Sequence, residues 1–263
     1  MRLTLLGTGN AAQVPVYNCQ CVACDRARHT PRFRRGPCSA LLEGDGARWL
    51  IDAGLPDLAE RYPPGSLDGI LLTHYHADHA QGLLPLRWGT GMTMQVLGPP
   101  DEEGLADLYK HPGILDFSRK LVPFETLALS GRKQSDAMQL TPLPLVHSRL
   151  TYGYAIRQGS RGMAYLTDTV GLPGSTAGRL SEHPLDLLVL DCTHPPAADM
   201  PRNHNDLTRA LDIVRMLRPG KAVLTHIGHK LDAFLMEHPA QLPPGVVVGR
   251  DGDVFDVAGL GGR

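Results

Sequence analysis

The sequence lacks any apolar run of the roughly 18 residues that a membrane-spanning helix needs, and the apolar run at residues 3–6 is too short for a signal peptide. It also has little excess charge, with a net charge of −1 and a pI near 6.9, and lysine is scarce. A near-neutral chain has no general attraction to nucleic acid or to a membrane. We therefore expect a cytoplasmic protein with neither as a partner.

Cysteine is rare, and the count of five is odd, which argues against a fully paired disulfide framework. Three of the five are grouped as Cys19-x-Cys21-x-x-Cys24. In a reducing compartment this spacing indicates a metal site before a disulfide, and a structural zinc ion needs a fourth ligand from elsewhere in the chain. Three unrelated free thiols are the alternative. The other two stand alone and are expected in the core: Cys38 and Cys192.

What the sequence does have is a dense group of metal-binding side chains directly after the apolar residues 69–72. His74 and His76 are two apart, so an extended segment would point both the same way. Asp78 and His79 are adjacent and face differently, which favours a second ion beside the first. Imidazoles mixed with a carboxylate suit zinc, manganese or iron better than magnesium or calcium. A histidine-rich surface turn is the alternative.

Further ligand types follow other predicted strands: His147 after residues 138–146, Asp168 after residues 161–166, and His226 after residues 222–225. An aspartate that leaves an apolar strand costs desolvation unless it is paired or coordinated. Asp168 is therefore a candidate to bridge two cations. His226 and His229 are three apart and can face two different sites if the chain bends at Gly228.

Two other polar residues stand next to predicted elements. Asp52 ends the second arm of a predicted hairpin, residues 40–43 and 48–51, and could either orient a ligating imidazole or cap a turn or helix. His204 precedes a helix predicted over residues 207–217, capped by Asn205 or Asp206, where an anion is favoured.

The rest of the pattern alternates strands and helices, as in an α/β protein, and 263 residues suffice for one large domain or two small ones. Strands are predicted at residues 3–6, 67–72, 95–97, 152–157 and 185–190, helices over residues 78–86 and from Pro99, and edge strands with a loop over residues 119–137. The arginines at positions 26–35 are expected to form a solvated face, with part of the approach for an anionic substrate as the alternative.

The set of strand-end ligands resembles the metallo-β-lactamase superfamily, with its H-x-H-x-D-H motif and its later His, Asp and His. The resemblance implies a four-layer αββα sandwich in a single domain, residues 1–263, with an N-terminal zinc-binding Cys loop at about residues 18–38. It also implies the ligand sets: His74, His76 and His147 for one ion, Asp78, His79 and His226 for the other, and Asp168 between them.

Three segments are further similar to the PhnP family of phosphoribosyl 1,2-cyclic phosphate phosphodiesterases of bacterial phosphonate breakdown: residues 19–24, 71–83 and 191–196, with shorter matches at residues 98–102, 110–113 and 201–204. This similarity implies two divalent cations, of which manganese is the first choice and zinc or iron are alternatives. It also implies a homodimer, and a structural zinc ion held by Cys19, Cys21, Cys24 and His229.

The implied reaction is hydrolysis of 5-phospho-α-D-ribosyl 1,2-cyclic phosphate, a small anionic phosphorylated sugar, to ribose 1,5-bisphosphate. Water activated between two cations would attack phosphorus. The similarity makes His204 the general acid, and Asp78 is the second candidate catalytic residue. The alternatives are another cyclic-nucleotide or RNA-processing phosphodiesterase, a thioester or lactam hydrolase, or a non-catalytic metal-binding protein. A nuclease would need a basic arm, and no lysine-rich insertion occurs.

Overall fold

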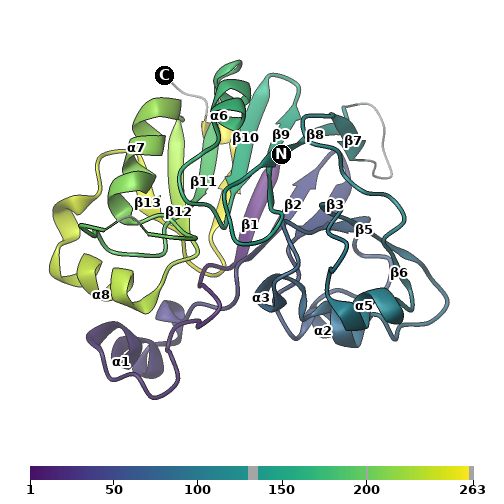
Figure 1. Cartoon of the computed structure of the whole chain (residues 1–263), viewed down its shortest axis with the longest axis horizontal. Coiled ribbons are helices and arrows are strands. Elements are labelled where there is room, and N and C mark those ends of the chain that lie inside the picture. The colour runs from purple at the N-terminus through teal and green to yellow at the C-terminus, as the bar shows by residue number, and fades with distance from the viewer. Residues whose placement is uncertain (130–135, 200, 261–263) are drawn as a thin grey trace.

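The computed structural model describes residues 1–129, 136–199 and 201–260, whose strands form two seven-stranded sheets (Figure 1). The first sheet has the order β14-β1-β2-β3-β4-β5-β6 and the second the order β13-β12-β11-β10-β9-β8-β7. The strands of the first sheet are β1 (Arg2–Gly7), β2 (Ser39–Gly44), β3 (Ala47–Ile51), β4 (Gly69–Leu71), β5 (Met94–Leu97), β6 (Leu115–Asp116) and β14 (Val254–Asp256). Those of the second are β7 (Leu127–Leu129), β8 (Met138–Pro144), β9 (Tyr152–Gln158), β10 (Arg161–Leu166), β11 (Leu187–Asp191), β12 (Lys221–Thr225) and β13 (Val246–Val248).

Helices cover the outer faces of both sheets. The α-helices are α1 (Val22–His29), α2 (Leu58–Arg61), α3 (Ala77–Ala80), α4 (Leu83–Leu86), α5 (Ala106–Lys110), α6 (Gly174–Ser181), α7 (Leu207–Leu217) and α8 (His229–Glu237), and the 3-10 helices are η1 (Pro31–Phe33), η2 (Pro239–Gln241) and η3 (Val257–Leu260). Side chains of α2, α4 and α5 pack with the first sheet, and those of α6, α7 and α8 pack with the second. The predicted αββα sandwich is confirmed.

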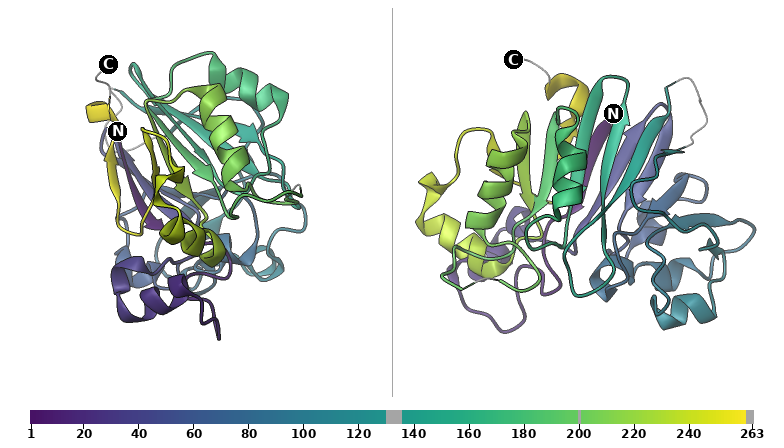
Figure 2. Two further views of the ribbon diagram at one scale, coloured as in Figure 1. Left: turned by 90° about the vertical axis from the view of Figure 1, so that its left-hand side faces the viewer. Right: turned by 45° about the horizontal axis from the view of Figure 1, so that its top comes forward.

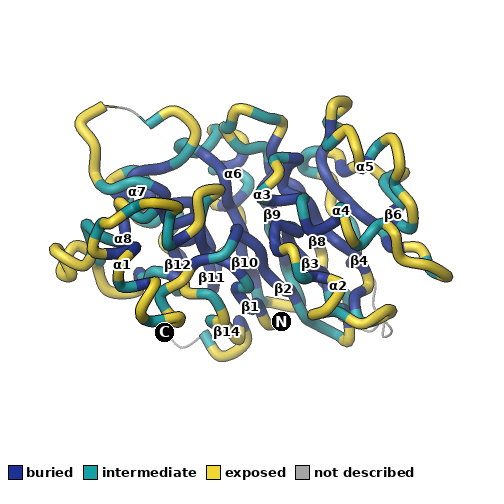
Figure 3. Tube along the Cα trace, turned by 90° about the horizontal axis from the view of Figure 1, so that it is seen from below, coloured by how far each residue is buried: buried dark blue, intermediate teal, exposed yellow. Residues whose placement is uncertain are grey.

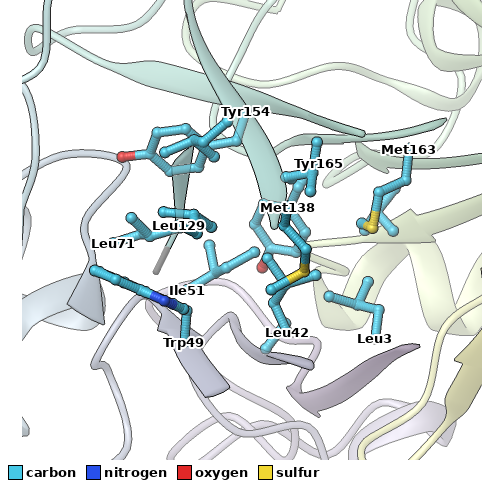
Figure 4. Close-up of a cluster of buried hydrophobic side chains, with 14 of the residues drawn as sticks. Leu3, Leu42, Trp49, Ile51, Leu71, Leu129, Met138, Tyr154, Met163 and Tyr165 are labelled. Atoms are coloured by element: carbon cyan, nitrogen blue, oxygen red, sulfur yellow. The ribbon is translucent and has the colours of Figure 1, made fainter. Parts of the chain in front are cut away.

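The layers follow from the period-2 alternation of the strands. In β10, Met163 and Tyr165 point into the core between the sheets, whereas Ala164 and Leu166 point outward to the helices. Both faces are therefore apolar, as a strand buried on both sides requires. Figure 4 shows the inner cluster, in which Met163 and Tyr165 from one sheet lie opposite side chains of the other, among them Leu3 and Leu42.

Strand direction explains why polar side chains gather at one edge. β3, β4, β5 and β6 are parallel neighbours, and so are β10, β11, β12 and β13. The carboxyl ends of parallel strands lie at the same edge of a sheet. Residues that follow β4, β10, β11 and β12 therefore emerge together. The two predicted hairpins, β2 with β3 and β9 with β10, are confirmed as antiparallel pairs.

Two of the predicted helices differ from the structure. The helix expected over residues 78–86 is interrupted between α3 and α4, where an added Cβ on Gly82 would lie 2.1 Å from the Leu55 carbonyl oxygen. The helix expected from Pro99 begins only at Ala106, because the Asp101 side chain accepts hydrogen bonds from two following backbone amides and forms a turn instead.

Other expectations had mixed outcomes. Of residues 119–137, the structure shows the short strand β7, while residues 130–135, with Lys133, lie outside the described residues. Asp206, rather than Asn205, caps α7 through the amide of Arg209. Arg35 was expected on a solvated face but is buried.

Among the described residues, no helix is both long enough and apolar enough to cross a membrane.

Candidate metal centre

All seven predicted catalytic-site ligands converge at the edge of the sandwich where β4, β8, β10 and β12 end. Figure 3 views the molecule from below, with the strands buried at its centre and exposed loops around them. The side chains lie in two adjoining groups, which Asp168 joins.

The first group consists of His74, His76, His147 and Asp168. His76 Nδ1 lies 2.8 Å from His74 Nε2 and 3.1 Å from His147 Nε2. Each of these two Nε2 atoms lies 3.6 Å from Asp168 Oδ2. Three ring nitrogens and one carboxylate oxygen thus face a common point, which is a donor set suited to a divalent transition-metal ion.

The second group consists of Asp78, His79 and His226, with the other oxygen of Asp168. His79 Nε2 and His226 Nε2 lie 3.3 and 3.4 Å from Asp168 Oδ1, and 3.5 and 3.9 Å from Asp78 Oδ2. Both Nε2 atoms are buried and have no hydrogen-bond partner. A buried imidazole nitrogen without a partner costs free energy unless it binds something, and a cation at this point would satisfy both. The residues fit two divalent ions, with one Asp168 oxygen directed to each.

Hydrogen bonds behind the rings fix which nitrogen faces the site. His79 Nδ1 donates to Asp52 Oδ2 at 2.8 Å, and His226 Nδ1 donates to Thr193 Oγ1 at 2.8 Å. His74 Nδ1 lies 3.0 Å from Thr73 Oγ1. These contacts leave each Nε2 free to bind a metal ion. Of the two interpretations of Asp52, the geometry supports the one in which it orients an imidazole.

The backbone is strained where three of these side chains leave their strands. Asp52, Asp168 and His226 have φ values of 59°, 61° and 58°, in the left-handed region that residues with a Cβ seldom adopt. Each stands one or two positions beyond the end of a strand. The sharp turn aims the side chain at the centre, and such strain concentrates at functional sites.

The pKa values of the two buried histidines of the motif shift in opposite directions. Burial and repulsion from His79 hold the pKa of His74 well below its usual range. Burial also disfavours charge on His79, but the carboxylates of Asp168 and Asp52 more than offset it and raise its pKa well above the usual range. A cation between the carboxylates would displace the proton on His79, so metal binding here is coupled to proton release.

His204 lies against this centre. Its ring stacks on His226 at a centroid distance of 4.6 Å and lies 5.1 Å from the ring of His147. Its Nδ1 donates to Asp191 Oδ2 at 2.7 Å. Burial lowers the pKa of His204, yet Asp191 more than compensates and raises it to about 9. His204 is therefore a proton-carrying group beside both ion sites.

The sequence interpretation missed three residues that position the others: Thr73, Asp191 and Thr193. Asp191 is the last residue of β11, and Asp168 likewise stands close to the end of β10, so its place at a strand end was a signal that could have found it. Thr73 and Thr193 carry no comparable signal, because a threonine beside a histidine is common and only the fold shows which ring it contacts.

The three clustered cysteines and His229 form a separate donor group. His229 Nδ1 lies 3.3, 3.5 and 3.7 Å from the sulfur atoms of Cys19, Cys21 and Cys24. Burial raises the pKa of the Cys24 thiol to about 12, so a bound cation would be needed to hold it as a thiolate. Three sulfurs and one imidazole are a donor set that fits a closed tetrahedral zinc site. Because His226 and His229 flank Gly228, one short segment serves both groups.

Buried Arg35 ties the cysteine loop to the rest of the fold. Its guanidinium donates to both carboxylate oxygens of Asp232 in α8, at 2.7 and 2.9 Å, and also to Thr8 Oγ1 and the Gly249 carbonyl. Each of the three guanidinium nitrogens thus donates at least one hydrogen bond, which offsets the cost of burying the ion pair. The two remaining cysteines, Cys38 and Cys192, lie in the core as predicted.

The sandwich with its paired His and Asp groups defines a hydrolase of the metallo-β-lactamase class. This chain belongs to that superfamily, since the family described as "Beta-lactamase superfamily domain" matches residues 47–227. Its membership also explains why the ligand types recur at strand ends.

Among known proteins, the chain is 30% identical over 267 residues to an octanoyltransferase of Porphyromonas gingivalis, covering 96% of this chain but only 51% of that protein. The chain thus spans about half the length of that relative. It is also 33% identical over 110 residues to coenzyme PQQ synthesis protein B of Methylobacterium radiotolerans, covering 36% of each protein.

Among solved structures, a diphosphatase from the PhnP family is 30% identical, with a TM-score of 0.77 and 97% of each chain covered. Zinc-bound PqqB from Methylobacterium extorquens has a TM-score of 0.75 at 20% identity, covering 97% of this chain and 100% of that one. The short form of human tRNase Z has a TM-score of 0.67 at 20% identity, covering 98% of this chain and 99% of that one. The last two show likeness of fold alone.

Proposed function

We propose that this chain is a metal-dependent phosphodiesterase of the PhnP type that hydrolyses 5-phospho-α-D-ribosyl 1,2-cyclic phosphate to ribose 1,5-bisphosphate. The observation that carries the proposal is the juxtaposition of two metal-suited donor groups with His204, an imidazole that lies beside both and donates to the buried Asp191 carboxylate. The identity of 30% over 97% of a PhnP-family diphosphatase supports it.

Residues of this chain would hold two divalent cations: His74, His76 and His147 on one side, Asp78, His79 and His226 on the other, with Asp168 between them. Manganese is our first choice, and zinc or iron suit the same donors. Bound there, the cations would supply an ionised water and offset charge on the phosphoryl oxygens. Asp78 combines the roles of ligand and candidate catalytic residue, because its carboxylate lies at the open side of the second group and is only partly buried.

His204 would deliver the proton that the departing ribose oxygen requires. Because Nδ1 donates to Asp191, Nε2 is the nitrogen left to donate to a substrate. Asp191 holds that tautomer and favours the charged ring. The ring of His204 stacks on His226, which sets the acid directly beside the second group.

We also propose a structural zinc ion on Cys19, Cys21, Cys24 and His229, within one domain that carries residues 18–38 as a zinc-binding loop. The substrate would be a small phosphorylated sugar, with no nucleic acid or membrane as partner. A homodimer and a cytoplasmic location stay predictions.

The deciding experiment is to incubate manganese-loaded enzyme with 5-phosphoribosyl 1,2-cyclic phosphate and follow the products by phosphorus NMR, with a 2′,3′-cyclic nucleotide as comparison. The proposal expects regioselective opening to ribose 1,5-bisphosphate, and slower turnover of the nucleotide. Turnover of the nucleotide without turnover of the ribosyl compound would refute the substrate assignment.

A second candidate is hydrolysis of a small diphosphate, because the 30%-identical PhnP-family protein is described as a diphosphatase. A phosphate leaving group is a weaker base than a ribose alkoxide and needs less help from a general acid. An organic diphosphate therefore belongs in the same NMR series. If it is the better substrate, the His204→Ala enzyme should retain much more activity on it than on a cyclic diester.

A further inference from the structure

A cavity of about 620 Å³ opens on the side of the sandwich where β13 and β14, the edge strands of the two sheets, lie together with α1 and α8. The left panel of Figure 2 faces this side of the molecule, with α1 in purple below the strands near the C-terminus in yellow. The cavity contains none of the proposed metal ligands. Its volume lies within the range of roughly 300–1,000 Å³ that is usual for small-molecule sites.

Positive charge dominates the lining of this cavity. Four cationic side chains line it against two acidic ones: Arg26, Arg35, Lys221 and Arg250 against Asp232 and Asp253. Arg35 and Asp232 neutralise each other through their bidentate pair. Asp253 accepts a hydrogen bond from the backbone amide of Arg250, and its side chain forms no ion pair with the described cations. The other three cations also form no ion pair among the residues that the structure describes.

Arg26 is the group that most needs a partner. Its Nε is buried and has no hydrogen-bond partner, although its guanidinium stacks 4.0 Å from the ring centroid of Phe33. Arg250 also lies over Phe33, at 5.4 Å, so two cations share one aromatic ring. Burial is the main cause that lowers the pKa of Arg26; the attraction of Asp232 opposes it, and repulsion from Arg35, Arg250 and Arg32 adds to it. An anion between Arg26 and Arg250 would relieve both the unpaired donor and the repulsion.

The remaining walls are apolar. Leu235 and Met236 of α8 face the cavity, as do Val246 to Val248 of β13 and Phe255 of β14. Cationic side chains on edge strands often have no ligand and serve only to prevent pairing with strands of other chains. Arg26 and Phe33, however, come from α1 and η1, which are not edge strands, and both line the cavity.

We propose that this cavity binds a small organic phosphate, with the phosphate held by Arg26, Arg250 and Lys221 and an apolar or aromatic body against α8 and β13. The site is separate from the proposed catalytic centre and does not depend on the function proposed for it. The cationic set recognises the doubly charged phosphate, and the apolar walls recognise the rest of the ligand.

The test is calorimetric titration of metal-loaded enzyme with adenosine monophosphate, and with adenosine as the ligand that lacks the phosphate. Because the metal centre can also attract a phosphate, the comparison is between the wild-type protein and the double variant Lys221→Gln/Arg250→Gln. Arg215→Gln, an exposed arginine on α7 paired only with Asp212, is the matched control.

The wild-type and control proteins should show a binding event that the double variant loses or weakens at least about ten-fold. Adenosine should give no such event. Equal isotherms in wild-type protein and double variant would overturn the proposal, as would adenosine binding as tightly as the monophosphate. Unchanged melting temperature, metal content and turnover in the double variant would show that the loss is local. If the double variant does not fold, Arg250→Gln alone, at an exposed position, gives the same comparison.

Discussion

His204 and Asp191 form a hydrogen-bonded pair, 2.7 Å from Nδ1 to Oδ2, at the margin of the candidate metal centre. Asp191 is fully buried, while the His204 side chain remains 20% exposed. The buried carboxylate also accepts from the backbone amides of Thr169 and Asn205, so it is held in place independently of His204. The pair therefore presents one ring nitrogen to the open face in a fixed orientation.

Replacing His204 with alanine should lower turnover of the cyclic diester by roughly a hundred- to ten-thousand-fold, which is the usual contribution of a general acid. The metal content should stay the same, because His204 is not among the proposed ligands. Steady-state kinetics together with elemental analysis check this. His183→Ala, an exposed histidine remote from the centre, is the control and should act like the wild-type enzyme. Wild-type turnover in the His204 variant would exclude the general acid.

Asp191→Asn should shift the pH dependence of the reaction. Asn still accepts from His204 Nδ1, but the negative charge that raises the pKa of His204 to about 9 is lost. Activity that needs protonated His204 falls as the pH rises through this pKa. The basic limb of the kcat/KM profile should therefore lie at lower pH in the variant. An unchanged basic limb would show that another group carries the proton.

The same pair predicts a pH-dependent difference in stability. A pKa raised from 6.5 to about 9 gives stabilisation that is complete below the lower value and disappears as the pH rises through the higher one. The melting temperature of Asp191→Asn should thus fall furthest below wild type near pH 6, and this deficit should shrink by about pH 10. A deficit that is constant over this range would contradict the linkage.

Cys21→Ala should release the proposed zinc ion and lower folding yield and melting temperature more than it lowers the intrinsic activity. The cysteine loop contacts α8 through His229 and Asp232, and neither of these is a proposed catalytic ligand. Cys192→Ala, which removes a buried thiol outside the cluster, is the matched control and should keep its zinc. The zinc content of the two variants, measured by elemental analysis, distinguishes these outcomes. Full stability of Cys21→Ala without any loss of metal would exclude the structural site.

Asp168→Asn should lower the catalytic metal content from two ions to at most one, because each oxygen of Asp168 faces a different group. The amide keeps the shape of the carboxylate but loses its charge and offers only one good ligand atom. Metal titration of the purified variant measures the stoichiometry. Two tightly bound ions in the variant would show that Asp168 does not bridge.

Gly54→Ala should destabilise the protein strongly. A Cβ there would lie 1.8 Å from the carbonyl oxygen of Asp78, so the turn after Asp52 and the motif helix α3 would have to separate. We expect a loss of several kcal/mol and of metal content, measured by chemical unfolding and elemental analysis. Gly178→Ala in α6, where a Cβ meets nothing within 4 Å, should be neutral or stabilise by up to about 1 kcal/mol.

The strand pattern and the ligand types could be predicted from the sequence because both are local properties. Apolar runs such as residues 69–72 are long enough to mark strands, and a histidine or aspartate after such a run is visible without knowing the fold. The residues at which helices begin and end were harder to predict from the sequence. The break between α3 and α4 depends on the Gly82 amide, which donates to the Ala53 carbonyl oxygen, a contact between segments distant in sequence. The turn that delays α5 depends on the Asp101 side chain, which could equally have capped a helix.

The sequence by itself therefore determined which residues could bind metal ions, and in which order they follow the strands. The family resemblance implied how these residues divide between two ions, and only the tertiary structure decided how their side chains are oriented. It directs the two oxygens of Asp168 to different groups, turns Asp52, Asp168 and His226 into left-handed conformations, and places Asp191 behind His204. The physical reason is that ligand type is a property of one side chain. Grouping and orientation arise from strand register, backbone turns and buried hydrogen bonds between segments far apart in the chain.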